Sequence, residues 1–209
     1  MFSSLTRLGS KPGMPVSDLR RKLQDALARP GGASSDFDLN AGVKIPAREL
    51  TPAAVLLGIR AETETVILTK RAARLKHHPG QIALPGGKQD PTDPTHADAA
   101  LREAQEEIGL PSGIVDVLGD LSPHQTVTGY QVTPVLALVK GAYDPVPEAG
   151  EVSEVFEVPL KHLLDSNNYL IEGRRWQGRR RSYYTVPFGP YYIWGATARI
   201  LRAFAERMA

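Results

Sequence analysis

The segment HADAALREAQEEIGL, residues 96–110, has the pattern of an amphipathic helix that concentrates negative charge on one face. Its apolar stripe consists of Ala97, Leu101, Ala104 and Ile108, and Gly109 suits the end of the helix. Glu103, Glu106 and Glu107 stand at i, i+3 and i+4, so the helical repeat brings their carboxylates to the same side. Like charges at this spacing destabilise a helix by a few tenths of a kcal/mol per pair. The face is therefore either an ordinary solvated surface or a site that binds positive charge.

The stretch LPGGKQDPTDPT, residues 84–95, leads directly into this helix and favours a binding site. Gly86 and Gly87 allow the backbone to turn sharply and to approach a ligand closely, although an ordinary β-turn is the alternative. Clustered oxygen donors are what Mg²⁺ or Mn²⁺ requires, and such ions are often shared with substrate phosphates. Arg102 could orient the carboxylate of Glu103, or simply form a surface ion pair.

Composition restricts the class of protein. The 209 residues carry a formal net charge of +2, which does not by itself indicate nucleic-acid binding. The chain has no cysteine, so disulfides, thiolate nucleophiles and cysteine-based zinc sites are excluded. No apolar run approaches the roughly 20 residues that span a bilayer. The start, MFSSLTRLGSKPG, is too short and polar for a secretory signal, so we expect a soluble cytoplasmic protein without membrane contact.

The periodicity elsewhere predicts a helical extension followed by one mixed domain. A helix is expected over 15–27, with Ser17 as its N-cap, and a linker over 28–42. Short β-branched or apolar runs predict strands over 53–59, 65–70, 113–121, 130–139, 154–160 and two strands within 168–188, and the last segment predicts a helix over 193–208. AETE, residues 61–64, suits a hairpin turn between the first two strands. We therefore expect an extension over 1–49 and, over 50–209, an α/β domain whose mixed strands lie between helices.

The acidic helix and its loop resemble the signature of the Nudix hydrolases, G-x5-E-x7-R-E-U-x-E-E-x-G-U, where U is aliphatic. The matching residues are Gly87, Arg102, Glu103, Ala104, Glu106, Glu107, Gly109 and Leu110. Two departures stand out. Asp93 occupies the position of the loop glutamate, with one additional residue before Arg102, and Ala104 is small for the aliphatic position.

The preceding segment, LTKRAARLKHHPGQIALPGG, resembles the extended signature of the coenzyme A pyrophosphatase branch, L-L-T-K-R-S-x-x-L-R-x-x-x-G-x-V-x-F-P-G-G. The matching residues are Leu68, Thr69, Lys70, Arg71, Leu75, Gly80, Pro85, Gly86 and Gly87. EVSEVFEVPL and IWGATARIL are similar to later segments of the same branch. The resemblance covers roughly residues 50–205 and leaves the first helix unexplained.

The resemblance implies a Nudix-type α/β/α sandwich with a mixed β-sheet, and Mg²⁺- or Mn²⁺-dependent hydrolysis of coenzyme A and its derivatives to 3′,5′-ADP and (acyl-)phosphopantetheine. The metal ligands that it implies are Glu103, Glu106, Glu107 and Gly87. The proton acceptor would be Glu103, Glu106 or Glu151, of which Glu151 could equally be a solvated loop acid, and Arg102 completes the catalytic set. The expected contacts to substrate phosphates are Lys70, Arg71 and Lys88.

Other interpretations remain open at this point. The substrate could be another nucleoside diphosphate derivative, such as ADP-ribose or a dinucleotide, or the fold could serve a noncatalytic nucleotide- or RNA-binding module. His77 and His78 lack a third partner and are expected to be loop residues. RRWQGRRR, residues 174–181, invites a nucleic-acid interpretation through Trp176, but one basic turn favours a solvated hairpin tip. The expected partner is therefore a small nucleotide substrate, and the resemblance leaves room for a homodimer.

Overall fold

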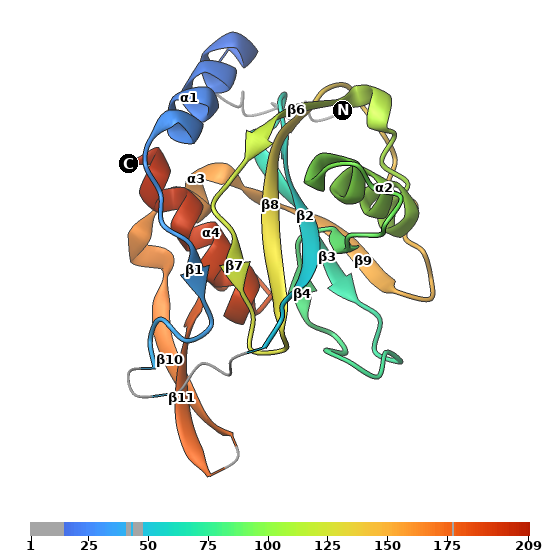
Figure 1. The fold of residues 1–209 in the computed structure, drawn as a ribbon. Helices are drawn as coiled ribbons and strands as arrows, with labels where there is room; N and C mark the ends of the chain where they lie inside the picture. Colours follow the sequence, from blue (N-terminus) through green and yellow to red (C-terminus); the bar gives the residue numbers. More distant parts are fainter. Residues whose placement is uncertain (1–14, 41–42, 44–47, 177) are drawn as a thin grey trace, which may run out of the picture.

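The computed structural model describes residues 15–40, 43, 48–176 and 178–209, so the beginning of the predicted extension lies outside the described residues. A mixed β-sheet forms the centre of the fold (Figure 1). Its strands are β1 (Ser34–Ser35), β2 (Thr51–Arg60), β3 (Thr65–Arg71), β4 (Ile82–Ala83), β5 (Gly86–Lys88), β6 (Val115–Asp120), β7 (His124–Gln125), β8 (Tyr130–Val139) and β9 (Val152–Pro159). Their alternating or continuous apolar residues explain why these segments form strands.

Strand β2 lies in the middle of the sheet. It pairs in parallel with the whole of β8, from Thr51↔Tyr130 to Arg60↔Val139, and antiparallel with β3 and β5. The β2–β3 pair confirms the predicted hairpin, and β9 and β6 add to it as antiparallel partners of β3 and β8. Parallel and antiparallel pairs thus occur together, which is the mixed sheet that the sequence predicts.

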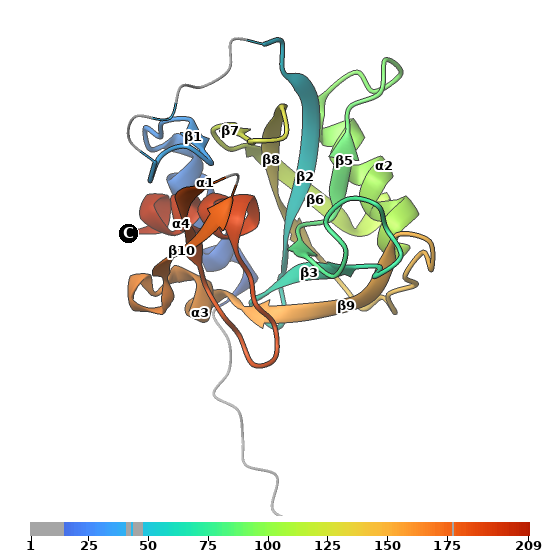
Figure 2. The ribbon, with the colours of Figure 1, turned by 90° about the horizontal axis from the view of Figure 1, so that it is seen from below.

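Helices cover both faces of this sheet. They are α1 (Val16–Ala28), α2 (His96–Ile108), α3 (Leu160–Leu164) and α4 (Gly195–Met208), with 3-10 turns at Ser112–Ile114 and Ser166–Asn168. One apolar cluster joins α2 to the sheet through Ala104, Ile108 and Ile67. The other joins α1 and α4 to the opposite face through Leu23, Phe204 and further side chains (Figure 2). The α/β/α sandwich is therefore confirmed.

The described residues that precede β2 in the sequence pack more closely against the domain than the predicted extension and linker suggest. Helix α1 buries Leu19 and Leu23 in the same cluster as α4. Its N-cap is Pro15, whose side chain makes no capping hydrogen bond. The prediction of Ser17 as N-cap is therefore wrong. The described part of the predicted linker forms β1, which pairs in parallel with β7 and buries the side chain of Phe37. This segment is consequently held against the domain.

Strands β10 (Leu170–Trp176) and β11 (Arg179–Thr185) form a separate antiparallel ribbon, which confirms the two strands predicted around the basic turn. The ribbon extends from the body below α4 (Figure 1). The nucleic-acid interpretation of this turn depends on Trp176, whose side chain lies outside the described part of the chain. None of the helices in the described ranges has the length and apolarity that crossing a membrane requires.

Candidate active site

The Gly-Gly loop lies between the central strand and the acidic helix. Gly86 pairs with Val55 of β2, and Gly87 pairs with Ala54. Gly86 has φ +147°, a conformation that side chains rarely adopt, and a Cβ there would collide with the carbonyl oxygen of Ala54. The glycine therefore allows β5 to lie directly on β2 and to bring its backbone to the start of the site.

Both ends of α2 are fixed by local interactions. The side chain of Thr95 accepts a hydrogen bond from the backbone N–H of Asp98, and the carboxylate of Asp98 accepts one from the backbone N–H of Thr95. This capping box satisfies N–H groups that the first turn leaves free. At the other end Gly109 takes a left-handed conformation with φ 67°, which confirms the predicted helix end. The helix thus holds its acidic side chains in a fixed register beside β5.

Glu107 is the most buried of the three glutamates. Only 5% of its surface is exposed, and its Oε2 accepts a hydrogen bond from the N–H of Gly86 at 3.1 Å. Burial raises the pKa of Glu107 to about 7, because the charged form loses its hydration. The hydrogen bond from Gly86 opposes this shift, whereas the charge of Glu103 adds to it. A buried carboxylate next to a like charge is well placed to receive a cation.

Arg102 neutralises the exposed part of the acidic face. Its Nη1 donates to Glu103 Oε1 at 2.9 Å and to Glu106 Oε2 at 3.0 Å. Its Nε and Nη2 donate to the two carboxylate oxygens of Asp93 at 3.1 and 2.9 Å. The hydrogen bond with Asp93, and after it that with Glu103, raise the pKa of Arg102, and the contact with Arg102 lowers the pKa of Asp93. The like-charge repulsion on α2 is therefore relieved within the protein itself.

The contact with Asp93 gives a role to the main departure from the Nudix signature. Asp93 has a shorter side chain than the glutamate of the signature, and the loop before α2 is one residue longer. Only 7% of the side chain of Asp93 is nevertheless exposed, and both of its carboxylate oxygens accept hydrogen bonds from the guanidinium of Arg102. A two-point contact of this kind fixes the plane of the guanidinium as well as its position. The longer loop thus still delivers a carboxylate to Arg102.

Glu103 lies between Arg102 and the Gly-Gly loop. Burial raises the pKa of Glu103, and the hydrogen bond from Arg102 opposes that shift. The missing side chain of Gly87 is what leaves room for it: a Cβ at Gly87 would stand 2.7 Å from the Cδ and both oxygens of the Glu103 carboxylate. The close approach of the Glu103 carboxylate consequently requires a glycine at position 87.

Two more of the predicted site residues act on Glu107 through their charges. Arg71, at the end of β3, lowers the pKa of Glu107, and Glu151 raises the pKa of both Glu107 and Glu103. The carbonyl of Glu151 accepts a hydrogen bond from the N–H of Ala72 at 2.8 Å, which holds its loop beside the end of β3. The structure therefore brings Arg71 and Glu151 into the neighbourhood of the acidic helix.

The two predicted lysines are placed differently. The carbonyl of Lys88 accepts a hydrogen bond from Arg102 Nη2 at 3.2 Å, so its backbone belongs to the site while its side chain is exposed. Lys70 is also exposed, but it follows Leu68 along the strand, and Leu68 packs in the cluster under α4. Because alternate residues share a face of a strand, Lys70 lies on the side of β3 away from α2. The structure does not group Lys70 with the glutamates.

The donor set suits a hard divalent cation. It offers the buried Glu107, the partly buried Glu103 and the exposed Glu106, whose carboxylate oxygens are the kind of ligand that such an ion prefers. As the side chains stand, no three acidic or histidine residues in the described ranges converge as metal ligands do. The reason is visible in the ion pairs, since Arg102 holds both Glu103 and Glu106. A cation at this site would share those two carboxylates with Arg102, which contacts one oxygen of each.

The two histidines considered in the sequence lie apart from the acidic helix, and two contacts within the site were not predictable from the sequence. His77 and His78 are exposed loop residues, as expected. The sequence did not reveal the hold of Asp93 on Arg102 or the donation from the N–H of Gly86 to Glu107. The first could have been suspected because an acid occupies the loop position of the signature. The second involves a backbone group and leaves no signal in the residue types.

Comparisons with known proteins identify the family of the chain. The model of the NUDIX domain matches residues 49–177, more than half of the chain. The uncharacterized Nudix hydrolase NudL of Yersinia pestis (strain Pestoides F) is 39% identical over 158 residues, which cover 75% of this chain and 79% of that protein. NudL of Yersinia pseudotuberculosis serotype O:1b (strain IP 31758) gives the same values. Among solved structures, a MutT protein from Methanosarcina mazei Go1 covers 78% of this chain and 96% of its own, with 20% identity and a TM-score of 0.47.

Proposed function

Because the chain belongs to the Nudix hydrolase family, we propose that it hydrolyses the pyrophosphate bond of coenzyme A and its derivatives to give 3′,5′-ADP and (acyl-)phosphopantetheine. Hydrolysis of a nucleoside diphosphate derivative is the general activity of this family. The choice of coenzyme A within that class is supported by the extended signature, LTKRAARLKHHPGQIALPGG.

The observation that carries the choice is the position of Arg71. This arginine belongs to the extended signature, and its charge acts on the buried carboxylate of Glu107. Coenzyme A differs from many nucleoside diphosphate derivatives by its 3′-phosphate, an additional dianion that needs a partner. A guanidinium can bind such a phosphate through two parallel hydrogen bonds. Arg71 stands close enough to the acidic helix to bind a substrate whose pyrophosphate lies there.

The side chains of the acidic helix would bind Mg²⁺ or Mn²⁺ through Glu103, Glu106 and Glu107, with a backbone carbonyl at Gly87. Bound there, such an ion supplies neutralisation of the pyrophosphate charge and a bound water of lowered pKa. Arg102 positions Glu103 and Glu106 through its two ion pairs, and Asp93 fixes the plane of Arg102.

A proton must leave the water that attacks the phosphorus, and three carboxylates can accept it. Glu103 and Glu106 lie on α2, and Glu151 lies on the loop in front of β9. The charge of Glu151 raises the pKa of both Glu103 and Glu107, which supports a place for it near them. We keep all three as candidates for the general base.

Rates on three substrates test the proposal. The ratio kcat/KM should be highest for coenzyme A, lower for dephospho-coenzyme A, and lower again for ADP-ribose. Charge-assisted phosphate hydrogen bonds contribute about 1.5–3 kcal/mol each, so loss of the 3′-phosphate should cost about tenfold or more. Arg71→Ala should reduce the ratio of kcat/KM between coenzyme A and dephospho-coenzyme A. Lys70→Ala, on the other face of β3, should leave this ratio unchanged.

The contrary outcome is equally clear. If ADP-ribose is hydrolysed far faster than any coenzyme A species, the assignment to the coenzyme A branch is wrong, although the hydrolase assignment stands. Equal efficiency on coenzyme A and dephospho-coenzyme A would show that Arg71 does not recognise the 3′-phosphate.

A further inference from the structure

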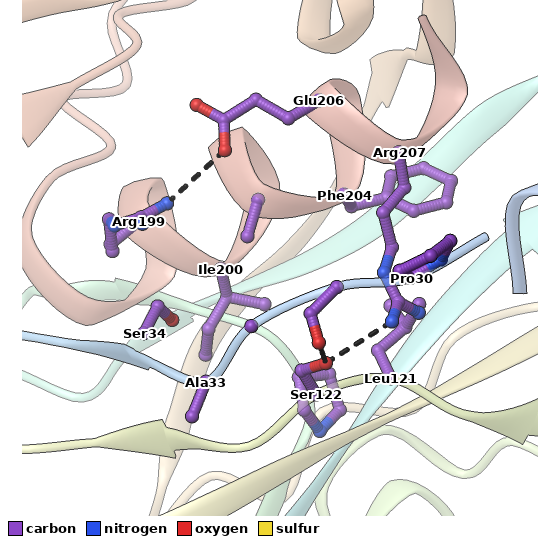
Figure 3. Close-up of a pocket in the computed structure, with 14 residues that line it drawn as sticks. Pro30, Ala33, Ser34, Leu121, Ser122, Arg199, Ile200, Phe204, Glu206 and Arg207 are labelled. Atoms are coloured by element: carbon purple, nitrogen blue, oxygen red, sulfur yellow. Dashed lines mark hydrogen bonds and ion pairs between the residues drawn. The ribbon is translucent and has the colours of Figure 1, made fainter.

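A cavity of about 280 Å³ lies on the opposite side of the sheet from α2, between α4 and the segment that follows α1 (Figure 3). The lining residues that matter here are Gly31, Ser34, Ser122, Arg199, Glu206 and Arg207. The volume is close to the lower end of small-molecule pockets, which begin at about 300 Å³. Neither the acidic helix nor the residues proposed to bind coenzyme A contribute to its walls.

Arg207 brings an unpaired positive charge to this cavity. Its side chain extends from α4 to Ser122, where Nη2 donates to the hydroxyl oxygen at 3.2 Å (Figure 3). Within the described ranges, Arg207 forms no ion pair with a carboxylate. A second guanidinium is close by, because Arg29 Nη1 donates to the backbone carbonyl of Arg207 at 2.5 Å. A half-buried guanidinium without a carboxylate partner is free to bind an external anion.

Arg199 has a buried nitrogen that is only partly satisfied. Its Nε donates to Asp38 at 2.8 Å. Its Nη1 is buried and has no hydrogen-bond partner within the described residues, since Glu206 Oε2 lies 3.8 Å away. The other oxygen of Glu206 accepts a hydrogen bond from Arg202 at 3.0 Å. A buried donor left without a partner is costly, and such groups in native proteins often face a water or a ligand.

The opposite wall of the cavity is held in place by buried hydrogen bonds. Ser34 Oγ lies 2.9 Å from Nδ1 of the fully buried His124, whose Nε2 lies 3.1 Å from Asp36 Oδ1. Because the carboxylate can only accept, the proton of a neutral imidazole belongs on Nε2, and Ser34 donates to Nδ1. The hydroxyl of Ser122 donates to the carbonyl of Gly31 at 2.8 Å. The cavity therefore has a prearranged polar surface.

Gly31 shows how closely the guanidinium is fitted. A Cβ at Gly31 would collide with the Nε, Cζ and Nη2 atoms of Arg207, whereas a Cβ at Gly32 would meet nothing within 4 Å. Neither glycine has a positive φ, so alanine is compatible with the backbone at both positions. The absence of a side chain at Gly31 thus permits Arg207 to lie flat on the chain beside the cavity.

We propose that this cavity binds the phosphate group of a small phosphomonoester at the guanidinium of Arg207. A guanidinium matches the oxygen geometry of phosphate, and Arg199, eight residues earlier on the same helix, adds a second guanidinium to the cavity wall. The volume leaves room for a small organic group beside the phosphate. The site is independent of the proposed hydrolysis, because it lies on the other face of the sheet.

Amide chemical shifts test the site directly. The isotope-labelled full chain is titrated with inorganic phosphate and, separately, with AMP as a phosphomonoester, in the presence of a chelator that keeps divalent ions from the acidic helix. Saturable shifts are expected at the amides of Gly31, Gly32 and Ala33. AMP should bind more tightly than inorganic phosphate, and acetate, a carboxylate with a single charge, should bind more weakly than either.

Matched variants then locate the charge. Arg207→Gln and Gly31→Ala should each raise Kd about tenfold or more, the second by displacing the guanidinium without removing its charge. Gly32→Ala is the control, and its Kd should stay within about twofold of the wild-type value. Hydrolysis of the nucleotide substrate should be unchanged in all three variants, which also shows that they fold. Equal affinity in all variants, or shifts confined to the Gly-Gly loop and α2, would overturn the proposal.

Discussion

Gly87→Ala should damage catalysis while leaving the fold intact. The new Cβ would stand 2.7 Å from three atoms of the Glu103 carboxylate. Carbon atoms in favourable contact are about 3.5–4.0 Å apart, so the carboxylate must retreat by roughly 1 Å. The atoms that move belong to the end of a flexible side chain. Gly87 does not have a positive φ, so alanine can adopt its backbone conformation.

A retreat of this size has a large kinetic consequence. It separates Glu103 from the position that Arg102 fixes by its 2.9 Å ion pair. Misplacing a catalytic group by about 1 Å can cost about a hundredfold in rate. We therefore expect kcat for coenzyme A to fall by about two orders of magnitude, with a melting temperature close to that of the wild type.

The assay compares initial rates at saturating substrate and Mg²⁺, with thermal unfolding followed by circular dichroism. Gly113→Ala is the matched control, because a Cβ at Gly113 would meet nothing within 4 Å. That variant should keep full activity. If Gly87→Ala is folded and turns over at the wild-type rate, the close approach of Gly87 and Glu103 has no part in catalysis, and the reasoning fails.

Three further predictions follow from individual residues and from the substrate. Glu107→Gln keeps the side-chain size but removes the charge, so hydrolysis should fall by orders of magnitude, and excess chelator should abolish it in the wild type; a wild-type rate in either experiment would contradict the metal site. Lys140 and Arg20 hold the pKa of Asp116 below its usual 3.8, so the stabilisation they provide is present above about pH 4 and is lost as the pH falls below the usual value. The difference in melting temperature between wild type and Asp116→Asn should accordingly shrink in acid, and a difference independent of pH would exclude this ion pair as its source. Free and short-chain acyl coenzyme A should be cleaved with kcat/KM values within about tenfold of one another, which corresponds to about 1.4 kcal/mol in transition-state free energy. A larger spread in competition assays would indicate that the protein recognises the acyl group.

The elements that the sequence predicted are those whose signal is local. The β2–β3 hairpin, the acidic helix and its end at Gly109 depend on periodicity and on one residue with a special backbone conformation. The capping box of α2 also has a local signal, because Thr95 and Asp98 stand three residues apart. By contrast, Ser17 has the chemistry of an N-cap and yet lies inside α1, because the helix begins one residue before it.

The features that the sequence could not supply depend on contacts between distant segments. Strand β1 has two residues, Ser34 and Ser35, and is specified by its pairing with His124 and Gln125 about 90 positions later. No pattern within such a short segment distinguishes it from a loop. The same holds for the candidate site. The three glutamates were predictable from helical spacing, but the position of Asp93 against their arginine depends on how the loop returns to the helix.

The central claim is tested most directly by identifying the products of hydrolysis. The protein is incubated with Mg²⁺ or Mn²⁺ and a panel of pyrophosphates that includes coenzyme A, ADP-ribose and a dinucleotide, and the products are identified by mass, with Glu106→Gln run in parallel. We predict that coenzyme A is the preferred substrate, that it gives 3′,5′-ADP and phosphopantetheine, and that the variant gives almost none of either. Intact coenzyme A after incubation with the wild type, or equal product from Glu106→Gln, would contradict the proposed function.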